Sequence, residues 1–211
     1  MSYLDARPLL FVVSGPSGSG KGTAVRHLAD HAGLQRITTY TTRAPRDTET
    51  DGVDYRFVDD DEFHRLYANG AIFEYTRTYS QSLYGSPTLL NDGSDPRPCV
   101  VELDPAGFVR TRAASARRVV GLFVTTVSEA ELRRRIQERG QGGEVTQRLK
   151  IRTDQMTWAW SYDYVLLNDD LDTFFADLRT VVHSEILRTA GARRLLELRT
   201  EIDPTLQRVD A

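Results

Sequence analysis

Short apolar runs alternate with amphipathic segments along most of the chain, which predicts an α/β fold. The run at residues 9–14 (LLFVVS) has no polar alternation, as is typical of a central parallel strand buried on both faces. Similar β-rich runs lie at residues 98–103, 119–124 and 163–167. Helical spacing of apolar residues is found between and after them, at 23–32, 105–115, 128–139, 144–160 and 171–199. This order implies βαβ crossovers and a mainly parallel sheet flanked by helices.

The segment from about residue 38 to 95 breaks this rhythm. It combines short polar and aromatic stretches with one expected helix near 59–69 and the turn cluster NDGSDP. We interpret it as an inserted, partly antiparallel subdomain over the C-terminal edge of the sheet, where open α/β sheets bind ligands. The core of this single domain is then expected at about 1–37 and 96–200. A loosely ordered tail is expected at about 200–211.

Composition and charge argue against several classes of protein. The chain has 211 residues, 40% of them hydrophobic and 27% charged, as expected for a globular domain. A net charge of −3 gives no basic footprint for nucleic acid. No apolar run approaches the ~18 residues needed to span a membrane, and no signal-peptide pattern is present. Cys99, the single cysteine, cannot form an internal disulfide and is expected to be buried, so we expect a cytoplasmic protein.

A phosphate-binding loop follows the first predicted strand. The G-x-x-x-x-G-K pattern lies between a strand and a helix, where glycines let backbone N–H groups surround phosphate oxygens at the positive end of the helix. Lys21 is expected to reach the β- and γ-phosphates. Gly22 stands where a serine or threonine is usual, so Thr23 or a water is expected at Mg²⁺. The predicted ATP-binding residues are Gly15, Pro16, Ser17, Gly18, Ser19, Gly20, Lys21, Gly22 and Thr23.

Further blocks of the sequence resemble guanylate kinases. They are TTRAPR (41–46), DGVDYRF (51–57) with the helix DDDEFHRL after it, FEY (73–75), YGSP (84–87), an arginine-rich stretch ending at Arg139, and YDYVLLNDD (162–170). The likeness runs from about residue 9 to 185. It implies a P-loop NTPase-type fold with an acceptor-binding insertion and a short lid at about 139–148. It also implies direct phosphoryl transfer from ATP, with Mg²⁺, to GMP or dGMP, without a covalent phosphoenzyme.

The acceptor blocks have the chemistry that a nucleoside monophosphate requires. Arg43 and Arg46 can form a bidentate clamp on its phosphate, and the hydroxyls of Tyr55 and Tyr84 suit the same oxygens. The resemblance implies that these four residues hold the acceptor phosphate. The alternatives are a solvated pair of arginines and ordinary core or edge aromatics.

Glu74 is the candidate for reading the base. A carboxylate can accept from the adjacent N1–H and N2–H₂ donors of guanine, whereas adenine has no such pair; an exposed glutamate is the alternative. The resemblance implies that Ser86 and Thr39 contact the other edge of the base. Asp104 can contact the acceptor or organise water at Mg²⁺, and with Pro105 after it can also cap the next helix.

The remaining candidates lie toward the C-terminus. Arg135 and Arg139 are four residues apart on one predicted helix face, and Arg148 follows a glycine-containing loop. Arginines on a closing lid would neutralise the transferring group and exclude water. The resemblance implies that Asn168 lies near the adenine of ATP. The expected catalytic residues are Lys21, Arg43, Arg135, Arg139 and Arg148.

Three functions stay open on the sequence. The first is a GMP kinase, favoured by Glu74 and Ser86 together with the arginine clamp. The second is a kinase of the same architecture for a modified purine nucleotide or a sugar phosphate, because the stretch 75–83, the residues after Asp104 and the short lid differ from the family pattern. The third is a non-catalytic binding module, which Lys21 and the lid arginines disfavour. The expected partners are small-molecule nucleotides, not nucleic acid or membrane, with the protein a monomer or a homodimer.

Overall fold

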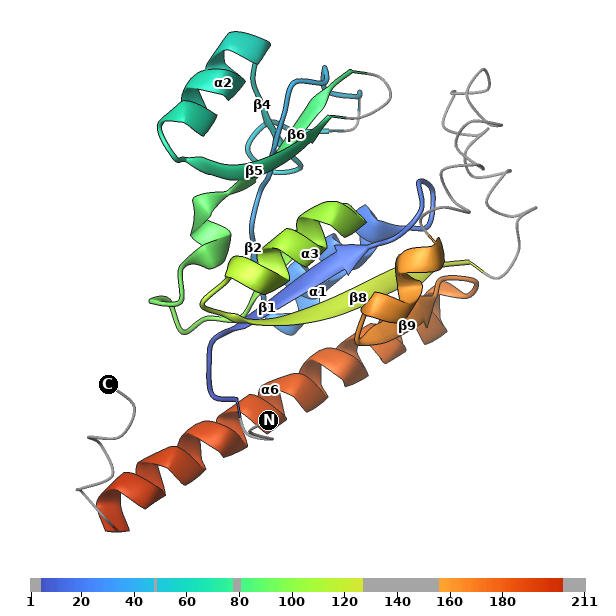
Figure 1. The fold of residues 1–211 in the computed structure, drawn as a ribbon. Coiled ribbons are helices and arrows are strands. Elements are labelled where there is room, and N and C mark those ends of the chain that lie inside the picture. Colours follow the sequence, from blue (N-terminus) through green and yellow to red (C-terminus); the bar gives the residue numbers. More distant parts are fainter. Residues whose placement is uncertain (1–4, 48, 78–80, 127–155, 203–211) are drawn as a thin grey trace.

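The computed structural model describes residues 5–47, 49–77, 81–126 and 156–202. In this part of the chain the backbone forms two sheets, one above the other in Figure 1. The first is a five-stranded parallel sheet with the strand order β2 (Gln35–Arg36), β7 (Cys99–Glu102), β1 (Leu9–Ser14), β8 (Arg118–Thr125) and β9 (Tyr164–Leu167). The second is a four-stranded sheet with the order β4 (Arg56–Phe57), β3 (Tyr40–Thr41), β6 (Leu83–Pro87) and β5 (Ile72–Arg77).

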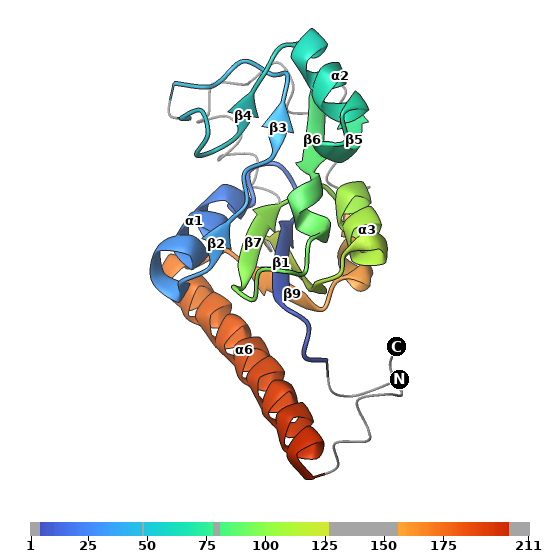
Figure 2. The same ribbon diagram turned by 90° about the vertical axis from the view of Figure 1, so that its left-hand side faces the viewer.

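Strand β1 lies in the middle of the parallel sheet and is buried over its whole length. Its side chains alternate between two cores, so that Phe11 and Val13 face one core while Leu10 and Val12 face the other. Helices α1 (Lys21–Ala32) and α6 (Leu171–Ile202) contribute to the first core, and α3 (Pro105–Ala114) with the 3₁₀ helix η3 (Thr157–Ser161) contributes to the second (Figure 2). Burial on both faces explains why this strand reads as a continuous apolar run.

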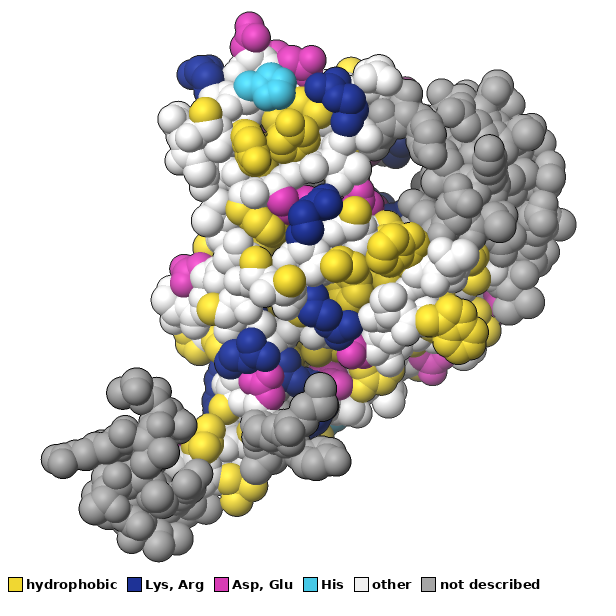
Figure 3. Space-filling view, viewed as in Figure 1, with side chains coloured by type: hydrophobic (Ala, Val, Ile, Leu, Met, Phe, Trp, Pro, Cys, Tyr) yellow, Lys and Arg dark blue, Asp and Glu magenta, His cyan; other side chains and the backbone are white. Residues whose placement is uncertain are grey.

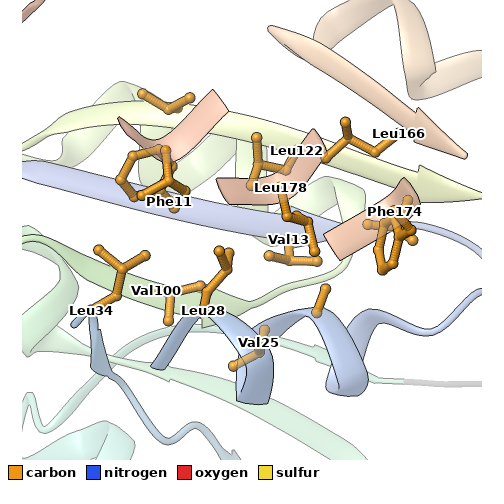
Figure 4. Packing of buried hydrophobic residues seen from close by; sticks show 14 of the residues in the cluster. Phe11, Val13, Val25, Leu28, Leu34, Val100, Leu122, Leu166, Phe174 and Leu178 are labelled. Atoms are coloured by element: carbon orange, nitrogen blue, oxygen red, sulfur yellow. The ribbon is translucent and has the colours of Figure 1, made fainter. Parts of the chain in front are cut away.

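The core between the parallel sheet, α1 and α6 fixes the position of α1. Val25 and Leu28 of α1 and Phe174 of α6 pack with Phe11 and Val13 of β1 (Figure 4). Each such side chain contributes about 1.5–3 kcal/mol by leaving water. The N-terminus of α1 is therefore held rigidly at the carboxyl end of β1.

The four-stranded sheet has a hydrophobic core of its own. It is built from Phe63 of α2 (Asp60–Ala68), Ile72 of β5 and Leu83 of β6. Helix α2 begins where the side chain of Asp59 accepts a hydrogen bond from the Glu62 backbone N–H, at 2.7 Å. Strand β6 pairs antiparallel with both β3 and β5, while β3 pairs parallel with β4. This lobe lies above the carboxyl ends of β1 and β7 (Figure 2).

Helix α6 runs along the parallel sheet and continues past it (Figure 1). Near its middle, Glu185 is buried and accepts a hydrogen bond from the Tyr164 hydroxyl at 2.8 Å while pairing with Arg118. These contacts tie α6 to β8 and β9. None of the helices within the described ranges is long and apolar enough to cross a membrane.

The predicted fold class is confirmed: a mainly parallel sheet is flanked by helices. The strands expected at 9–14, 98–103, 119–124 and 163–167 are present within one or two residues of these bounds. The helix pattern expected at 144–160 is described only at its end, where Met156 is α-helical and Thr157–Ser161 forms a short 3₁₀ helix. The expected helix at 128–139 lies outside the described residues.

The packing of β8 against α3 gives a test of this core. A Cβ at Gly121 would lie 2.6 Å from Phe108 Cζ and 2.8 Å from Tyr162 Cδ1, and these two rings stack on each other. We expect Gly121→Ala to lower the free energy of unfolding by about 1–3 kcal/mol through overpacking, measured by urea denaturation. Gly191→Ala is the control, since nothing lies within 4 Å of a Cβ there and α6 should become slightly more stable. Equal stability of the Gly121 variant and wild type would contradict this packing.

Candidate active site

The phosphate loop connects β1 to α1 and depends on glycine at two close approaches. Gly15 and Gly20 have φ values of 147° and 99°, which residues other than glycine rarely adopt. A Cβ on Gly15 would lie 2.0 Å from the carbonyl oxygen of Val124, and a Cβ on Gly20 would lie 2.1 Å from Nδ2 of Asn168. The loop thus lies directly against the ends of β8 and β9, and its tight turn carries the chain into the N-terminus of α1.

The side chain of Asn168 holds the phosphate loop in place by a hydrogen bond. Its Nδ2 donates to the backbone carbonyl of Ser19 at 2.8 Å, and its own backbone N–H donates to Thr125 at 2.8 Å. The side chain is buried, and neither its Oδ1 nor the buried Ser19 hydroxyl has a hydrogen-bond partner in the described part of the chain. Contact with adenine stays a prediction for this residue; the structure places it as a brace that fixes the loop.

Lys21 is the first residue of α1 and lies over the loop. Its Nζ donates to the Pro16 carbonyl at 3.1 Å and lies 3.7 Å from a carboxylate oxygen of Glu102 at the end of β7. The negative charge of Glu102, together with burial, raises the pKa of the Tyr55 hydroxyl. Glu102 therefore faces both the loop and the acceptor lobe. Our sequence analysis missed it, although an acidic residue that closes an apolar strand was a usable signal.

Glu49 lies between the two arginines that were predicted to clamp the acceptor phosphate. Arg43 donates to both carboxylate oxygens of Glu49, from Nη1 at 2.8 Å and from Nη2 at 3.0 Å. Arg46 donates to it from the backbone at 2.9 Å and from Nη1 at 3.4 Å. Burial works to raise the pKa of Glu49, but the hydrogen bonds and charges of Arg43 and Arg46 outweigh it and lower this pKa. The two arginines are thus brought together, by a carboxylate that no motif had indicated.

The predicted tyrosines lie beside this cluster. The hydroxyl of Tyr84 accepts a hydrogen bond from Nε of Arg43 at 3.0 Å, and the guanidinium of Arg43 lies 5.4 Å from the ring centre of Tyr55. The Tyr55 and Tyr84 rings contact each other edge to face, with centroids 5.8 Å apart. Arg43 therefore packs between two tyrosines and Glu49, which fixes its guanidinium. Such a cluster suits an anion with several oxygens.

Glu74 lies in the interior of β5 and is buried, with 8% of its surface exposed. The strand register places it opposite Ser86 of β6, whose hydroxyl donates to its Oε1. Nε of Arg110, from α3, donates to its Oε2 at 2.7 Å. The expected alternative, an exposed glutamate, does not apply. Arg110 was not predicted from sequence, because it meets Glu74 only through the packing of α3 under β5.

Asp104 caps α3 at the same junction. Its Oδ1 accepts the backbone N–H of Gly107 at 2.6 Å, and Pro105 occupies the first turn, as the capping interpretation predicted. A Cβ on Gly107 would lie 3.2 Å from both Asp104 Oδ1 and Glu74 Oε1. Asp104 thus lies near Glu74, and a direct contact with the acceptor stays a prediction. Figure 3 shows basic and acidic side chains next to each other where the two lobes meet.

The other predicted residues divide into two groups. Thr39 is buried just before β3, and Thr23 lies in the first turn of α1, two residues after Lys21; contact of Thr39 with the base and contact of Thr23 with Mg²⁺ stay predictions. The lid residues fall outside the described residues. They are Arg135, Arg139 and Arg148.

Comparisons with known proteins agree on one family. A family model described as guanylate kinase matches residues 7–185. A guanylate kinase of Gluconobacter oxydans (strain 621H) is 34% identical over 206 residues, which cover 94% of this chain and 97% of the relative. One from Caulobacter vibrioides is 36% identical over 195 residues, 90% of this chain and 91% of the relative. The crystal structure of guanylate kinase from Anaplasma phagocytophilum matches with a TM-score of 0.72 and 29% identity, over 92% of this chain and 96% of that one.

The lowered pKa of Glu49 makes the arginine cluster sensitive to acid. Because the folded state binds the ionised carboxylate, the stability it contributes is fully present above about pH 4.5, its ordinary value, and is lost as the pH falls through the lowered pKa. We expect Glu49→Gln to lower the free energy of unfolding by about 1 kcal/mol at pH 7, and this difference to shrink in acid. Urea denaturation of both proteins from pH 7 to pH 3 measures it.

The control for this prediction is Glu197→Gln, which removes an exposed ion pair with Arg194 on α6. Exposed pairs contribute little, so this variant should match wild type at every pH. A Glu49→Gln difference that stays constant across the pH range would show that the carboxylate charge does not hold the cluster.

Proposed function

Because the chain belongs to the guanylate kinase family, we propose that it transfers the γ-phosphoryl group of ATP to GMP, or to dGMP, forming GDP or dGDP and ADP. Both substrates are nucleotides, and transfer takes place directly between them, without a covalent intermediate on the protein. The phosphate loop binds ATP at the parallel sheet, and the four-stranded lobe binds the acceptor above it.

One observation carries the proposal: base-reading and phosphate-binding groups share one face of one strand. Tyr84 and Ser86 are two residues apart on β6, so their side chains point to the same side of the sheet. Tyr84 touches Arg43, and Ser86 touches Glu74. A nucleoside monophosphate lying along β6 would place its phosphate at the arginine and its base at the carboxylate. An acceptor without a guanine-like edge would leave Glu74 without its donors.

The phosphate loop, the acceptor lobe and the lid each contribute different groups to phosphoryl transfer. Backbone N–H groups of the loop and the N-terminus of α1 receive the phosphate oxygens of ATP, and Lys21 adds a positive charge to them. Arg43, held by Tyr84 and Glu49, orients the phosphate of the acceptor. Positioning and charge neutralisation supply most of the rate in this chemistry. Arg135, Arg139 and Arg148 complete the proposal as the charges on the lid.

Mg²⁺ belongs to the same proposal, and the residues at the loop fit it. Mg²⁺ prefers hard oxygen ligands and in kinases takes one or two protein oxygens together with phosphates and water. The described residues hold no group of three or more His, Cys, Asp or Glu for a protein-only metal cage, whereas the Thr23 hydroxyl and the Glu102 carboxylate border the loop. When bound, the ion neutralises charge on the β- and γ-phosphates.

The proposed domain organisation assigns ATP binding, GMP binding and closure to different parts of the chain. The core at about 1–37 and 96–200 binds ATP, the insertion at about 38–95 binds GMP, and the lid at about 139–148 closes over both. A cytoplasmic location is supported by Cys99, a buried free thiol, because proteins without disulfides are typical of reducing compartments.

The role of Lys21 gives a direct test. We expect Lys21→Ala to lower kcat by at least about 100-fold, because this charge acts on the transferring group. A coupled ADP-release assay with GMP, dGMP, AMP, UMP and ribose bisphosphate measures wild type and variant. Arg97→Ala, on an exposed loop, is the control for folding and should keep full activity. Wild-type turnover with an acceptor other than a guanine nucleotide would overturn the proposed substrate.

Glu74 tests how the base is recognised. We expect Glu74→Ala to raise the KM for GMP by at least about tenfold while leaving the KM for ATP within about twofold, because only the guanine edge loses its acceptor. The measurement is steady-state kinetics with each substrate varied in turn. Equal losses for GMP and for ATP would assign Glu74 to the stability of the lobe instead.

A further inference from the structure

Arg110 reaches from the parallel-sheet body to the base-reading carboxylate. It lies on α3, and its guanidinium donates from Nε to Glu74 Oε2 at 2.7 Å and from Nη2 to the Thr76 hydroxyl at 3.0 Å. The Arg110 side chain is 43% exposed, whereas that of Glu74 is 9% exposed. Arg110 thus binds two side chains of β5 at once, and the bond to Thr76 helps to fix the orientation of its guanidinium.

A count of acceptor sites shows what this contact leaves for a ligand. An ionised carboxylate has two oxygens and about four lone-pair sites. Ser86 donates one hydrogen bond to Oε1 and Arg110 donates one to Oε2 from Nε, while Nη2 of Arg110 lies 2.5 Å from the same Oε2. Counted by hydrogen bonds, each oxygen keeps one acceptor site. The guanine edge presents two adjacent donors, N1–H and N2–H₂, which match one remaining site on each oxygen.

The charge of Arg110 also compensates for the burial of Glu74. A buried carboxylate without a charged partner is strongly unfavourable. The ion pair offsets this cost before any ligand arrives, and the hydrogen bonds from Arg110 and Ser86 hold the carboxylate in one orientation. A neutral side chain at position 110 would not provide the charge that compensates for the burial of Glu74.

We propose that Arg110 is a positioning residue for base selection, which orients Glu74 so that one acceptor site on each of its oxygens faces the guanine edge. This inference rests on the proposed function and deepens it, because it assigns part of the guanine preference to a residue of α3. A purely structural role is the competing explanation, since the same contact joins the two lobes.

The test compares Arg110→Gln with a matched variant of the same helix. Arg112→Gln also removes an ion pair from α3, but its partner is Asp163 and its second bond goes to the Ser161 carbonyl, both in the parallel-sheet body. We expect Arg110→Gln to raise the KM for GMP about tenfold, with the KM for ATP and kcat within about twofold, as one charged hydrogen bond requires. Arg112→Gln should leave all three within about twofold.

Inosine monophosphate as the acceptor distinguishes a role of Arg110 in positioning Glu74 from a purely structural role. Its base keeps N1–H but lacks the 2-amino group, so it uses only one of the two acceptor sites on Glu74. We expect Arg110→Gln to reduce the preference for GMP over this analogue, as the ratio of kcat/KM values, by at least about threefold. An unchanged ratio, with kcat/KM lowered equally for both acceptors, would show that Arg110 only joins the two lobes and would overturn the inference.

A double-mutant cycle tests whether Arg110 acts through Glu74. In the background of Glu74→Gln, adding Arg110→Gln should change the KM for GMP less than about twofold, because the positioned carboxylate is already gone. Full additivity would overturn the inference. If Arg110→Gln does not fold, Arg110→Lys replaces it, and a smaller rise in the same KM is expected because lysine keeps only the charge. A wild-type protein that does not use GMP would instead overturn the proposed function.

Discussion

The cations proposed to act on the nucleotides, directly or through Glu74, are each held by a carboxylate in the described part of the chain. Lys21 lies by Glu102, Arg43 is bound by Glu49, and Arg110 pairs with Glu74. A long cationic side chain left in solvent would have to be ordered on binding, at a cost in affinity. The carboxylates remove that cost and keep like charges in the cleft from repelling each other. The candidate active site is therefore a set of ion pairs rather than an open patch of positive charge.

The two sheets supply these pairs in different ways. In the parallel sheet, β1 and β7 pair in register, with Val13 opposite Glu102, so the phosphate loop after β1 and the acid at the end of β7 meet at the same edge. Open parallel sheets bind ligands at this edge for the same reason. In the antiparallel lobe, the pairing of β5 with β6 places Glu74 opposite Ser86, and the side chain of Arg110 then enters from α3. Register thus fixes the base site as firmly as the loop fixes the phosphate site.

The sequence predicted what depends on local pattern and missed what depends on contacts distant in the chain. The central strand, the glycine loop and the cap at Asp104 follow from spacing within a few residues, and the structure has all three. Arg110 meets Glu74 across 36 residues, and Asn168 meets Ser19 across 149, so neither contact has a local signature. Glu49 is close to its partners in the sequence, three residues after Arg46, yet a single acidic residue in a turn is usually predicted to be solvent-exposed. The predicted roles of the lid arginines belong to residues outside the described ranges.

The proposed base selection rests on the pairing of the buried Glu74 with the partly exposed Arg110. With Ser86 and Arg110 in place, Glu74 keeps acceptor sites that only a base with donors at this edge can fill. Adenine would place the lone pair of its N1 against the carboxylate, which leaves buried acceptors unpaired and adds repulsion. Sites built around buried hydrogen-bonding groups reject a ligand that lacks the matching groups by about 10⁴–10⁵-fold, far more than a missing methylene achieves. In the proposed function, guanine specificity is thus set mainly by what a wrong base would leave unpaired, and the role proposed for Arg110 is to keep Glu74 in the orientation that the guanine edge matches.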